Sequence, residues 1–153
     1  MEKYKIKFQY KNKTFIIRKL RLIDINLEYV NALKKEKFLT TIPKKLNIKK
    51  QKIIINKINK SKNKKLIGFF YRDRLLGTCG FQNLNKKKVS IGVFLFNKNF
   101  VGKGFGKVFI SLASFYIYYF FKKKYFIAGI MRSNHKSLGA FKGAGFKILN
   151  KKK

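Results

Sequence analysis

The sequence is short of several residue types, and each shortage excludes a class of protein. It has one proline, no tryptophan and a single cysteine, Cys79, so neither an internal disulfide nor a cysteine-built metal site is available. A lone cysteine in an apolar segment is typical of a small buried residue on a strand, and such cysteine use suits a reducing cytoplasm. The charged N-terminus lacks the apolar segment of a secretory signal. We therefore predict a cytoplasmic protein without a metal.

Long hydrophobic runs are also missing. The longest one, residues 108–121, covers 14 residues, and as a helix it would be about 21 Å long. The hydrocarbon core of a bilayer is about 30 Å thick. The run therefore predicts a buried helix and no membrane span.

Negative charge is scarce: five aspartates and glutamates stand against 39 lysines and arginines, which gives a formal net charge of +34. Such a charge favours a nucleic-acid or anionic-membrane partner, and aromatic residues adjoin lysines in residues 120–125. The basic residues are nearly all lysine, however, and lie along the whole chain. Lysine, asparagine, isoleucine, phenylalanine and tyrosine make up 90 of the 153 residues, and all five have A/T-rich codons. Genomic bias thus explains the charge at least as well, and a nucleic-acid partner is the less favoured alternative.

A length of 153 residues and a hydrophobic fraction of 46% are typical of one domain with its own core. Runs of β-branched and aromatic residues predict strands, and an apolar period near 3.6 predicts helices. Strands are predicted at residues 4–10, 14–22, 66–71, 75–81, 89–96, 125–131 and 146–149, and helices at residues 24–37, 50–60, 106–121 and 137–143. This order predicts an α/β protein with a mixed, mostly antiparallel sheet flanked by about four helices.

Local signals set several of these limits. Asp24 is expected to cap the first helix, and Pro43 is expected to break the chain after it. The second helix is expected to bury Ile53, Ile54 and Ile58. The first two strands are expected to pair across a short turn.

The most informative segment lies between the central predicted strand and the longest helix. It runs Val101-Gly102-Lys103-Gly104-Phe105-Gly106-Lys107. Glycine at every second position lets backbone N–H groups approach a phosphate, because no Cβ is in the way, and the following helix adds the positive end of its dipole. The segment therefore predicts a phosphate-binding loop. Its glycine spacing matches neither the P-loop of ATP-binding proteins nor the dinucleotide fingerprint.

A second motif follows the strand after the long helix. Residues 134–146 read Asn-His-Lys-Ser-Leu-Gly-Ala-Phe-Lys-Gly-Ala-Gly-Phe. With the glycine loop and the order of elements, this motif resembles the Asn-x-x-Ser/Ala, aromatic and Gly-Phe signature of the GNAT superfamily of N-acetyltransferases. Residues 18–33 resemble the start of the branch that contains ribosomal-protein and amino-sugar acetyltransferases. The resemblance covers about residues 14–149 and implies a GNAT-like fold with acetyl-CoA as co-substrate.

The resemblance also implies where the coenzyme lies. Its pyrophosphate would be held by the amides of the glycine loop, and Lys103 and Lys107 would add positive charge. The pantetheine arm would pair with the backbone of Phe94, Leu95 and Phe96. The members expected in the loop are Val101, Gly102, Lys103, Gly104, Phe105, Gly106 and Lys107.

The second motif supplies the remaining expected site residues. Asn134 would hydrogen-bond the coenzyme arm, or it would simply cap the following helix, and Ser137 and Phe141 would complete the coenzyme-binding set. Many relatives have a tyrosine as general acid where this chain has Phe141, and the resembling branch often has a glutamate where this chain has Ser90. Ser90 and Asn134 are therefore the expected catalytic residues. Water near Ser90, backbone carbonyls or the sole histidine, His135, are alternative proton routes.

The end of the chain departs from the family. Members usually continue past the Gly-Phe strand into a hairpin, whereas only residues 147–153 follow here. Residues 1–153 are thus expected to form one GNAT-like domain with a truncated hairpin. Either the final strand is missing, or its place is taken by residues 4–10 or by another subunit in a homodimer.

The implied function is transfer of an acetyl group from acetyl-CoA to a primary amine, on an amino sugar or a nucleotide-linked amino sugar. A protein N-terminus is the alternative acceptor. A basic nucleic-acid-binding protein and a catalytically inactive acetyltransferase-like domain are the alternatives of another class.

Overall fold

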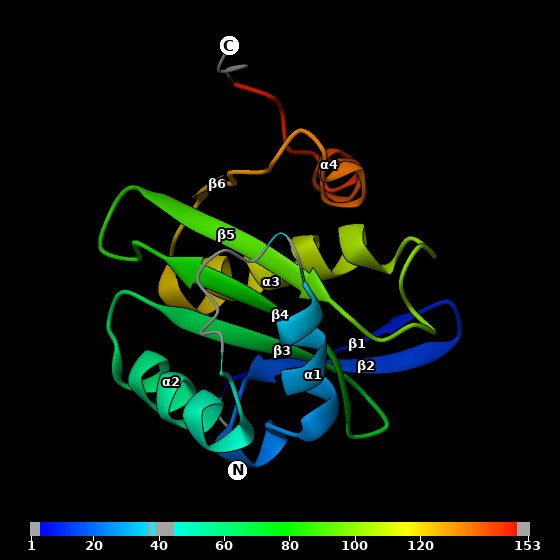
Figure 1. The fold of residues 1–153 in the computed structure, drawn as a ribbon. Coiled ribbons are helices and arrows are strands. Elements are labelled where there is room, and N and C mark those ends of the chain that lie inside the picture. Colours follow the sequence, from blue (N-terminus) through cyan, green and yellow to red (C-terminus); the bar gives the residue numbers. More distant parts are fainter. Residues whose placement is uncertain (1–3, 37, 39–44, 150–153) are drawn as a thin grey trace.

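Six strands form one sheet in a computed structural model that describes residues 4–36, 38 and 45–149 (Figure 1). They lie in sequence order across the sheet. The strands are β1 (Lys5–Tyr10), β2 (Lys13–Lys19), β3 (Lys65–Tyr71), β4 (Arg74–Gln82), β5 (Lys88–Leu95) and β6 (Tyr125–Ile127). Neighbours from β1 to β5 are antiparallel, and β6 runs parallel to β5. The predicted mixed, mostly antiparallel sheet is confirmed.

Two-residue turns join the hairpins β1–β2 and β3–β4. Lys11 and Asn12 have φ of 51° and 60°, and Arg72 and Asp73 have φ of 48° and 61°. Two successive positive φ angles match the right-handed twist of the paired strands. The predicted pairing of the first two strands is therefore confirmed.

Helices cover both faces of the sheet. The helices are α1 (Leu27–Lys35), α2 (Ile48–Lys60), α3 (Phe105–Phe121) and α4 (His135–Gly143). Figure 1 shows α1 and α2 in front of the sheet and α3 behind it. None of the helices within the described ranges is long and apolar enough to cross a bilayer.

Each face has its own hydrophobic core. On the α3 face, Phe69 stacks on Phe109 with ring centroids 4.1 Å apart, and Phe15 packs against the same ring. On the α1 and α2 face, Leu20 and Ile55 are completely buried. The two cores hold the sheet from both sides, because alternate residues of a strand point to opposite faces.

Several local expectations are wrong. Asp24 does not cap α1: it ends a 3₁₀ helix, Leu22–Asp24, and Asn26 caps α1 by accepting a hydrogen bond from the Tyr29 amide at 2.9 Å. The carboxylate of Asp24 instead accepts two hydrogen bonds from the Arg18 guanidinium, at 2.6 and 2.8 Å. The predicted helix end at Lys37 and the break at Pro43 lie outside the described residues.

The second and last predicted elements also need correction. α2 starts earlier, and it buries Gln51 and Ile55. Of the three isoleucines expected to be buried, Ile54 and Ile58 are partly buried against the core, whereas Ile53 is half-exposed. β6 has only three residues, and residues 146–149 form no strand. The Phe146 amide donates to the Phe141 carbonyl at 3.0 Å, which turns the chain back onto α4 instead of along the sheet.

The place beside β6 is not taken by the N-terminal strand. β1 lies at the opposite edge of the sheet, where it pairs with β2. A second subunit at that edge stays a prediction.

We expect Asp24→Asn to destabilise the fold by about 3 kcal/mol at pH 7, because it removes the carboxylate charge that the buried Arg18 guanidinium binds with two hydrogen bonds. Burial alone would raise the pKa of Asp24, but its hydrogen bonds to Arg18 and the Arg21 amide hold this pKa below its ordinary value. Because the pKa of Asp24 is lower in the folded state, its ionised carboxylate stabilises the fold. This contribution is fully present above the unfolded-state pKa of about 3.9 and is lost as the pH falls through the folded-state pKa. Urea denaturation across this range measures the difference.

Asp73→Asn is the matched control, since Asp73 lies on an exposed turn where asparagine tolerates positive φ. An Asp24→Asn loss no larger than that of the control, or one that does not shrink in acid, would contradict this account.

Candidate active site

The sheet opens on one side of β5. Ser90–Leu95 is the part of β5 that pairs with β4, but β6 pairs with β5 only at Lys88, Val89 and Ser90. From Ile91 onward the other edge of β5 therefore has no ladder partner among the described residues. An unpaired strand edge presents N–H and C=O groups to which an extended ligand can bind as a further strand would.

The open edge contains two of the three residues predicted to pair with a coenzyme arm. Phe94 and Leu95 lie within it, opposite Thr78 and Gly77 of β4. Phe96 lies just beyond, where its amide and that of Asn97 both donate to the Leu76 carbonyl at 3.1 Å. These two hydrogen bonds turn the chain out of the sheet. They also give the Phe96 amide a partner, so this amide is not available to a ligand.

The glycine loop continues from the end of β5 to the start of α3. The buried Asn97 organises it, because its carbonyl accepts from the Phe100 and Val101 amides at 3.0 and 3.1 Å. Gly102 and Gly104 have φ of +73° and +84°, which glycine adopts without strain. A Cβ at Gly102 would meet nothing within 4 Å. The first turn of α3 follows at once, and the amides of a first helical turn have no intrahelical partner.

The lack of a side chain at Gly106 also serves the packing of two helices. A Cβ there would lie 3.2 Å from the Ala140 Cβ, so this glycine lets α4 approach the first turn of α3. The Lys107 stem also contacts α4, since a Cβ at Gly143 would lie 3.1 Å from its Cδ. The loop and the second motif are therefore in direct contact.

The residues of the second motif lie on α4. The Asn134 side chain accepts a hydrogen bond from the Ser137 amide at 3.2 Å and caps the helix, as one of the two readings expected. Phe141 is buried and its ring packs edge-on against Phe146 at 5.0 Å. In the structure Phe141 thus stabilises α4 on the core.

Ser90 lies at the end of the short β5–β6 ladder, opposite Ile127, where the two strands part. Its Oγ accepts a hydrogen bond from the Asn83 side chain at 3.3 Å. The hydroxyl is half-buried. Ser90 is therefore adjacent to the start of the open edge.

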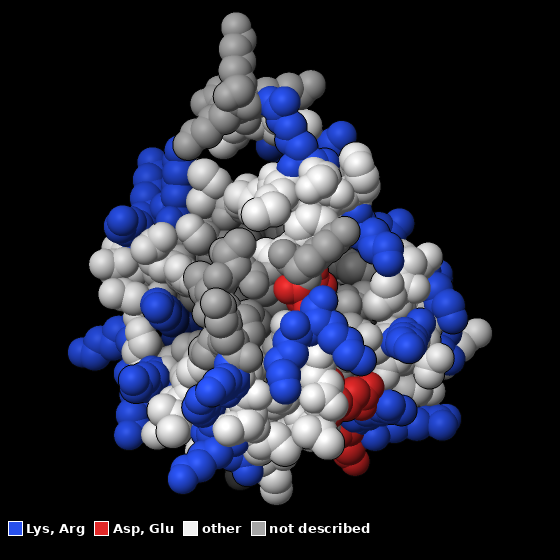
Figure 2. Space-filling view, viewed as in Figure 1, with Lys and Arg blue, Asp and Glu red and all other residues white. Residues whose placement is uncertain are grey.

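A groove of about 670 Å³ lies between α1 and the end of β5, and we call it the α1 groove. Its charged and polar lining residues are Glu28, Asn31, Lys35, Glu36, Arg74, Asn97, Lys98 and Asn99. Phe94 and Phe96 contribute aromatic surface. The groove holds two of the five acidic residues of the chain, and Figure 2 shows the few acidic side chains of this face within a surround of lysine and arginine.

The carboxylates of the groove are fixed by hydrogen bonds. Glu36 accepts from the Phe38 amide at 3.1 Å. Glu28 accepts from the Arg74 guanidinium at 3.1 and 3.2 Å, which joins α1 to the β3–β4 hairpin. Neither carboxylate is predictable from the sequence as a site residue, because neither lies in the central strand and no local pattern relates α1 to the end of β5.

Beneath the groove lies a buried polar cluster. Tyr29 is 2% exposed, and its hydroxyl bonds Thr78 and accepts a weak hydrogen bond of 3.4 Å from Gln51. Burial raises the pKa of Tyr29 to about 12, so its hydroxyl stays protonated at neutral pH. Its ring lies 5.6 Å from that of Phe96. The cluster thus supports the end of β5 from below.

Lys11 is a third residue of the site region that was not expected from the sequence. From the tip of the β1–β2 hairpin its Nζ donates to the Lys103 carbonyl at 2.9 Å, across 92 positions of sequence. The same Nζ lies 5.4 Å from the centroid of the Phe105 ring. The hairpin tip therefore contacts the glycine loop and stabilises it.

Cys79 is fully buried on β4, as predicted, and burial raises the pKa of its thiol. A buried protonated thiol is a poor nucleophile. No group of three or more metal-ligating side chains converges in the ranges that the structure describes.

Comparison with known proteins shows the family to which the chain belongs. A family model described as an acetyltransferase (GNAT) domain matches residues 14–147. No curated protein sequence is similar enough to the chain to count as a match.

Solved structures of low identity share the fold. The spermidine N-acetyltransferase from Vibrio cholerae in complex with CoA and spermine has a TM-score of 0.72 and 14% identity, over 86% of this chain and 79% of that one. The Campylobacter jejuni N-acetyltransferase PseH in complex with acetyl coenzyme A has a TM-score of 0.65 and 21% identity, over 90% of this chain and 92% of that one. The ribosomal-protein-S5-alanine acetyltransferase from Vibrio fischeri has a TM-score of 0.70 and 13% identity, over 93% of this chain and 83% of that one.

We expect Gly104→Val to abolish binding of acetyl-CoA. A β-branched residue is strained at a φ of +84°, and its side chain would lie against Lys11 Nζ and the Tyr10 hydroxyl, each 3.9 Å from the new Cβ. Calorimetric titration with acetyl-CoA measures the loss.

Lys122→Val controls for the strain itself, because Lys122 also has positive φ, 58°, but caps the opposite end of α3. Equal loss of binding in both variants would mean that general destabilisation is the cause.

Proposed function

Because the chain belongs to the GNAT family of acetyltransferases, it transfers an acetyl group from acetyl-CoA, and we propose that the acceptor is the primary amine of an amino sugar bound in the α1 groove. The observation that carries this proposal is the position of the groove. It adjoins the end of the open β5 edge through Phe94, Leu95 and Phe96. An amine bound there and a thioester bound along the edge would meet at one strand.

The open edge and the glycine loop suit the two parts of the coenzyme. The pantetheine arm would add to β5 as an extra strand beside Phe94 and Leu95. The pyrophosphate would lie at the loop, where backbone amides and the α3 dipole favour an anion. Lys103 and Lys107 add positive charge, and the hydrogen bond from Lys11 keeps the loop in shape.

The chemistry is direct transfer. The neutral amine nitrogen attacks the thioester carbonyl carbon, the carbon–sulfur bond breaks, and the thiolate takes up a proton while the nitrogen loses one. Cys79 does not carry the acetyl group, because its thiol is buried and protonated. Ser90, beside the point where β5 and β6 part, would relay a proton through water, and Asn134 would orient the coenzyme arm. Proximity supplies much of the rate.

An amino sugar fits the lining of the groove. The side-chain amides of Asn31, Asn97 and Asn99 offer donors and acceptors for hydroxyl groups. The carboxylate of Glu36 would attract the protonated amine before it loses its proton, whereas that of Glu28 is paired with Arg74. Phe94 and Phe96 provide apolar surface for the carbon face of the ring.

A panel of amines tests the acceptor class by release of free CoA. The panel contains amino sugars with and without phosphate, spermidine and a peptide with a free N-terminal alanine. We expect the amino sugars to have the highest kcat/KM. A preference of tenfold or more for spermidine or the peptide would overturn the amino-sugar proposal, and no turnover with any amine would favour an inactive domain.

We expect Glu36→Gln to raise KM for the acceptor by about tenfold, or about 1.4 kcal/mol, and to leave the Kd of acetyl-CoA unchanged. The glutamine still accepts the hydrogen bond from the Phe38 amide, so only the charge is lost. Steady-state kinetics with calorimetry separates the two constants. Lys34→Gln is the matched control, since Lys34 is exposed on the same turn of α1 and does not line the groove. An unchanged KM in Glu36→Gln would remove this carboxylate from acceptor binding.

A further inference from the structure

The exposed side of α3 is aromatic near its C-terminal end, and we call this surface the α3 patch. It consists of Phe115, Tyr118 and Tyr119, which are 47%, 46% and 55% exposed. Their spacing of three and four positions places them on one face of the helix. The Phe115 ring lies 6.5 Å from that of Tyr118 and 5.8 Å from that of Tyr119. The three rings therefore form one continuous surface, while the opposite side of α3 packs in the core.

The composition of the chain does not explain this patch. Lysine and arginine make up 39 of the 153 residues, yet neither occurs in residues 108–121. A helix with one exposed side normally has charged residues on that side, and a bias toward lysine would place them there. Large aromatic side chains gathered at exposed positions instead indicate a surface that a partner covers.

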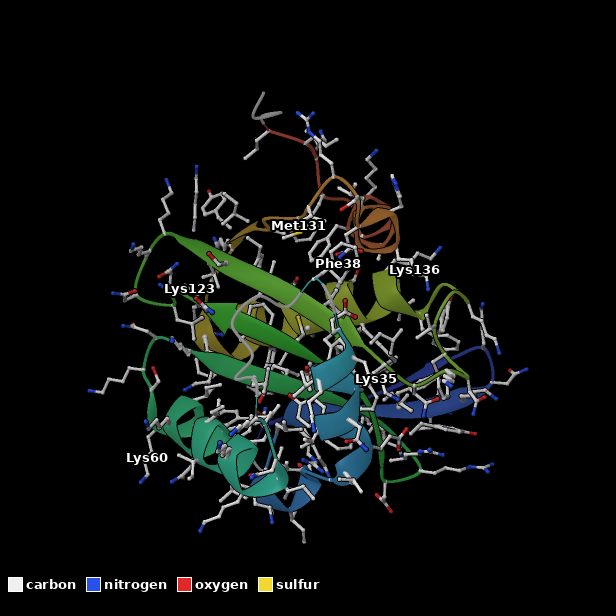
Figure 3. The ribbon with its side chains drawn as sticks, in the orientation of Figure 1. Lys35, Phe38, Lys60, Lys123, Met131 and Lys136 are labelled. Atoms are coloured by element: carbon white, nitrogen blue, oxygen red, sulfur yellow. The ribbon has the colours of Figure 1, made fainter. Side chains whose placement is uncertain are left out.

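Lysines border the end of the patch. Lys122 Nζ lies 5.3 Å from the centroid of the Tyr119 ring and donates a hydrogen bond to the Tyr119 carbonyl at 2.9 Å. Lys65 Nζ lies 5.7 Å from the centroid of the Phe121 ring. Lys123 follows at the left of Figure 3, where α3 ends. The ammonium groups are thus held close to the rings.

Negative charge lies away from the patch. Residues 74–153, which include α3, contain no aspartate or glutamate. Asp24, Glu28 and Glu36 lie in α1 or beside it, and Asp73 lies in the β3–β4 turn. Figure 2 shows acidic side chains on the face of α1, whereas Figure 1 shows α3 behind the sheet. The α3 patch and its lysines therefore complement a partner that is both anionic and apolar.

We propose that the α3 patch docks the protein on the surface of an anionic lipid bilayer. The three rings enter the boundary between headgroups and acyl chains, where a tyrosine has apolar surroundings for its ring and polar surroundings for its hydroxyl. The lysines at the end of α3 bind the anionic headgroups. The contact is confined to the bilayer surface, because α3 stays packed on the sheet. This inference goes beyond the proposed function and does not depend on it.

Two other partners fit the patch less well. A nucleic acid strand lying along residues 108–121 would cross about 21 Å of helix without meeting a cation of that helix. A second copy of the chain would find about 300 Å² of apolar surface in three half-exposed rings, whereas a stable interface needs about 800 Å² per partner. Two copies also repel each other, since each has a formal net charge of +34.

Docking through the patch leaves the candidate site accessible. Phe115 lies about 15 Å along α3 from Phe105, where the helix begins after the glycine loop. The α1 groove lies beside α1, on the face of the sheet opposite to α3. A bilayer against α3 therefore leaves both substrates free to enter from solvent.

The first test uses the absence of tryptophan from the chain. Tyr119→Trp places one reporter in the patch, and Ile23→Trp places one on the other face, where Ile23 is 81% exposed. The full chain is mixed with vesicles of phosphatidylcholine and phosphatidylglycerol in equal parts, at about 150 mM salt. We expect the emission of the Tyr119→Trp variant to shift to shorter wavelength and to be quenched by brominated acyl chains. The same response in both variants, or in neither, would overturn the inference.

The second test measures vesicle binding by sedimentation. Phe115→Gln/Tyr119→Gln removes two rings and keeps a good helix former at each position, so we expect binding to weaken by about tenfold or more. Ile23→Gln/Ile53→Gln is the matched control, because it removes two exposed apolar side chains from the other face. We expect this control to change binding by less than about twofold. Equal losses in the two variants would mean that the patch has no special role.

The same assay tests the lysines. Lys122→Asn/Lys123→Gln removes two charges beside the patch, and asparagine is chosen because Lys122 has a φ of 58°. Lys60→Gln/Lys136→Gln removes the same charge from the end of α2 and from α4 (Figure 3). We expect the first variant to weaken binding by about tenfold or more and the second by less than about twofold.

Three further results would overturn the inference. The first is equal binding to vesicles of phosphatidylcholine alone, which have no anionic headgroup. The second is a dimer that forms without vesicles and depends on Phe115 and Tyr119, which would assign the patch to a second copy of the chain. The third is a single-stranded RNA that displaces the vesicles and depends on the same two rings.

Discussion

The parting of β5 and β6 after Ser90 is the constraint on which the candidate site depends. A strand inside a sheet normally has both edges paired, and an unpaired edge must find water or a ligand for its N–H and C=O groups. Here β6 pairs with only three residues of β5, and the chain continues from the unpaired part of β5 directly into the glycine loop. The same strand thus offers a place for an extended arm and leads to a place for an anion.

The two hydrophobic cores keep this opening in place. α3 is held on one face by the aromatic cluster around Phe109, and α1 and α2 are packed on the other face around Leu20 and Ile55. Because the cores are on both sides of the sheet, β5 is fixed without help from β6. α4 is fixed in turn by its close approach to Gly106. The edge is therefore formed before any ligand binds.

The sequence predicted most elements because their signals are local: strand alternation, turn residues, and the glycines before α3. It failed where tertiary partners decide. Asp24 has the chemistry of a helix cap, but the Arg18 guanidinium binds both of its oxygens. Residues 146–149 have strand propensity but turn back onto α4. The glycine loop and the α1 groove depend on contacts of Lys11 with Lys103 and of Arg74 with Glu28, at separations of 92 and 46 positions, and no short pattern encodes these.

Composition and function act on different parts of this molecule. The coenzyme region is made mainly of backbone: an unpaired strand edge, two glycines with positive φ, and the first turn of a helix. Such a site can form in a sequence in which five residue types make up 90 of the 153 positions, because few of its contacts depend on the identity of a side chain. An acceptor site must discriminate by side-chain chemistry. It therefore has to use residue types that the composition disfavours, and the α1 groove contains two of the five acidic residues and one of the five arginines. In a chain with so strong a bias, rare residues gathered around a cavity are a better guide to specificity than the abundant lysines on the surface.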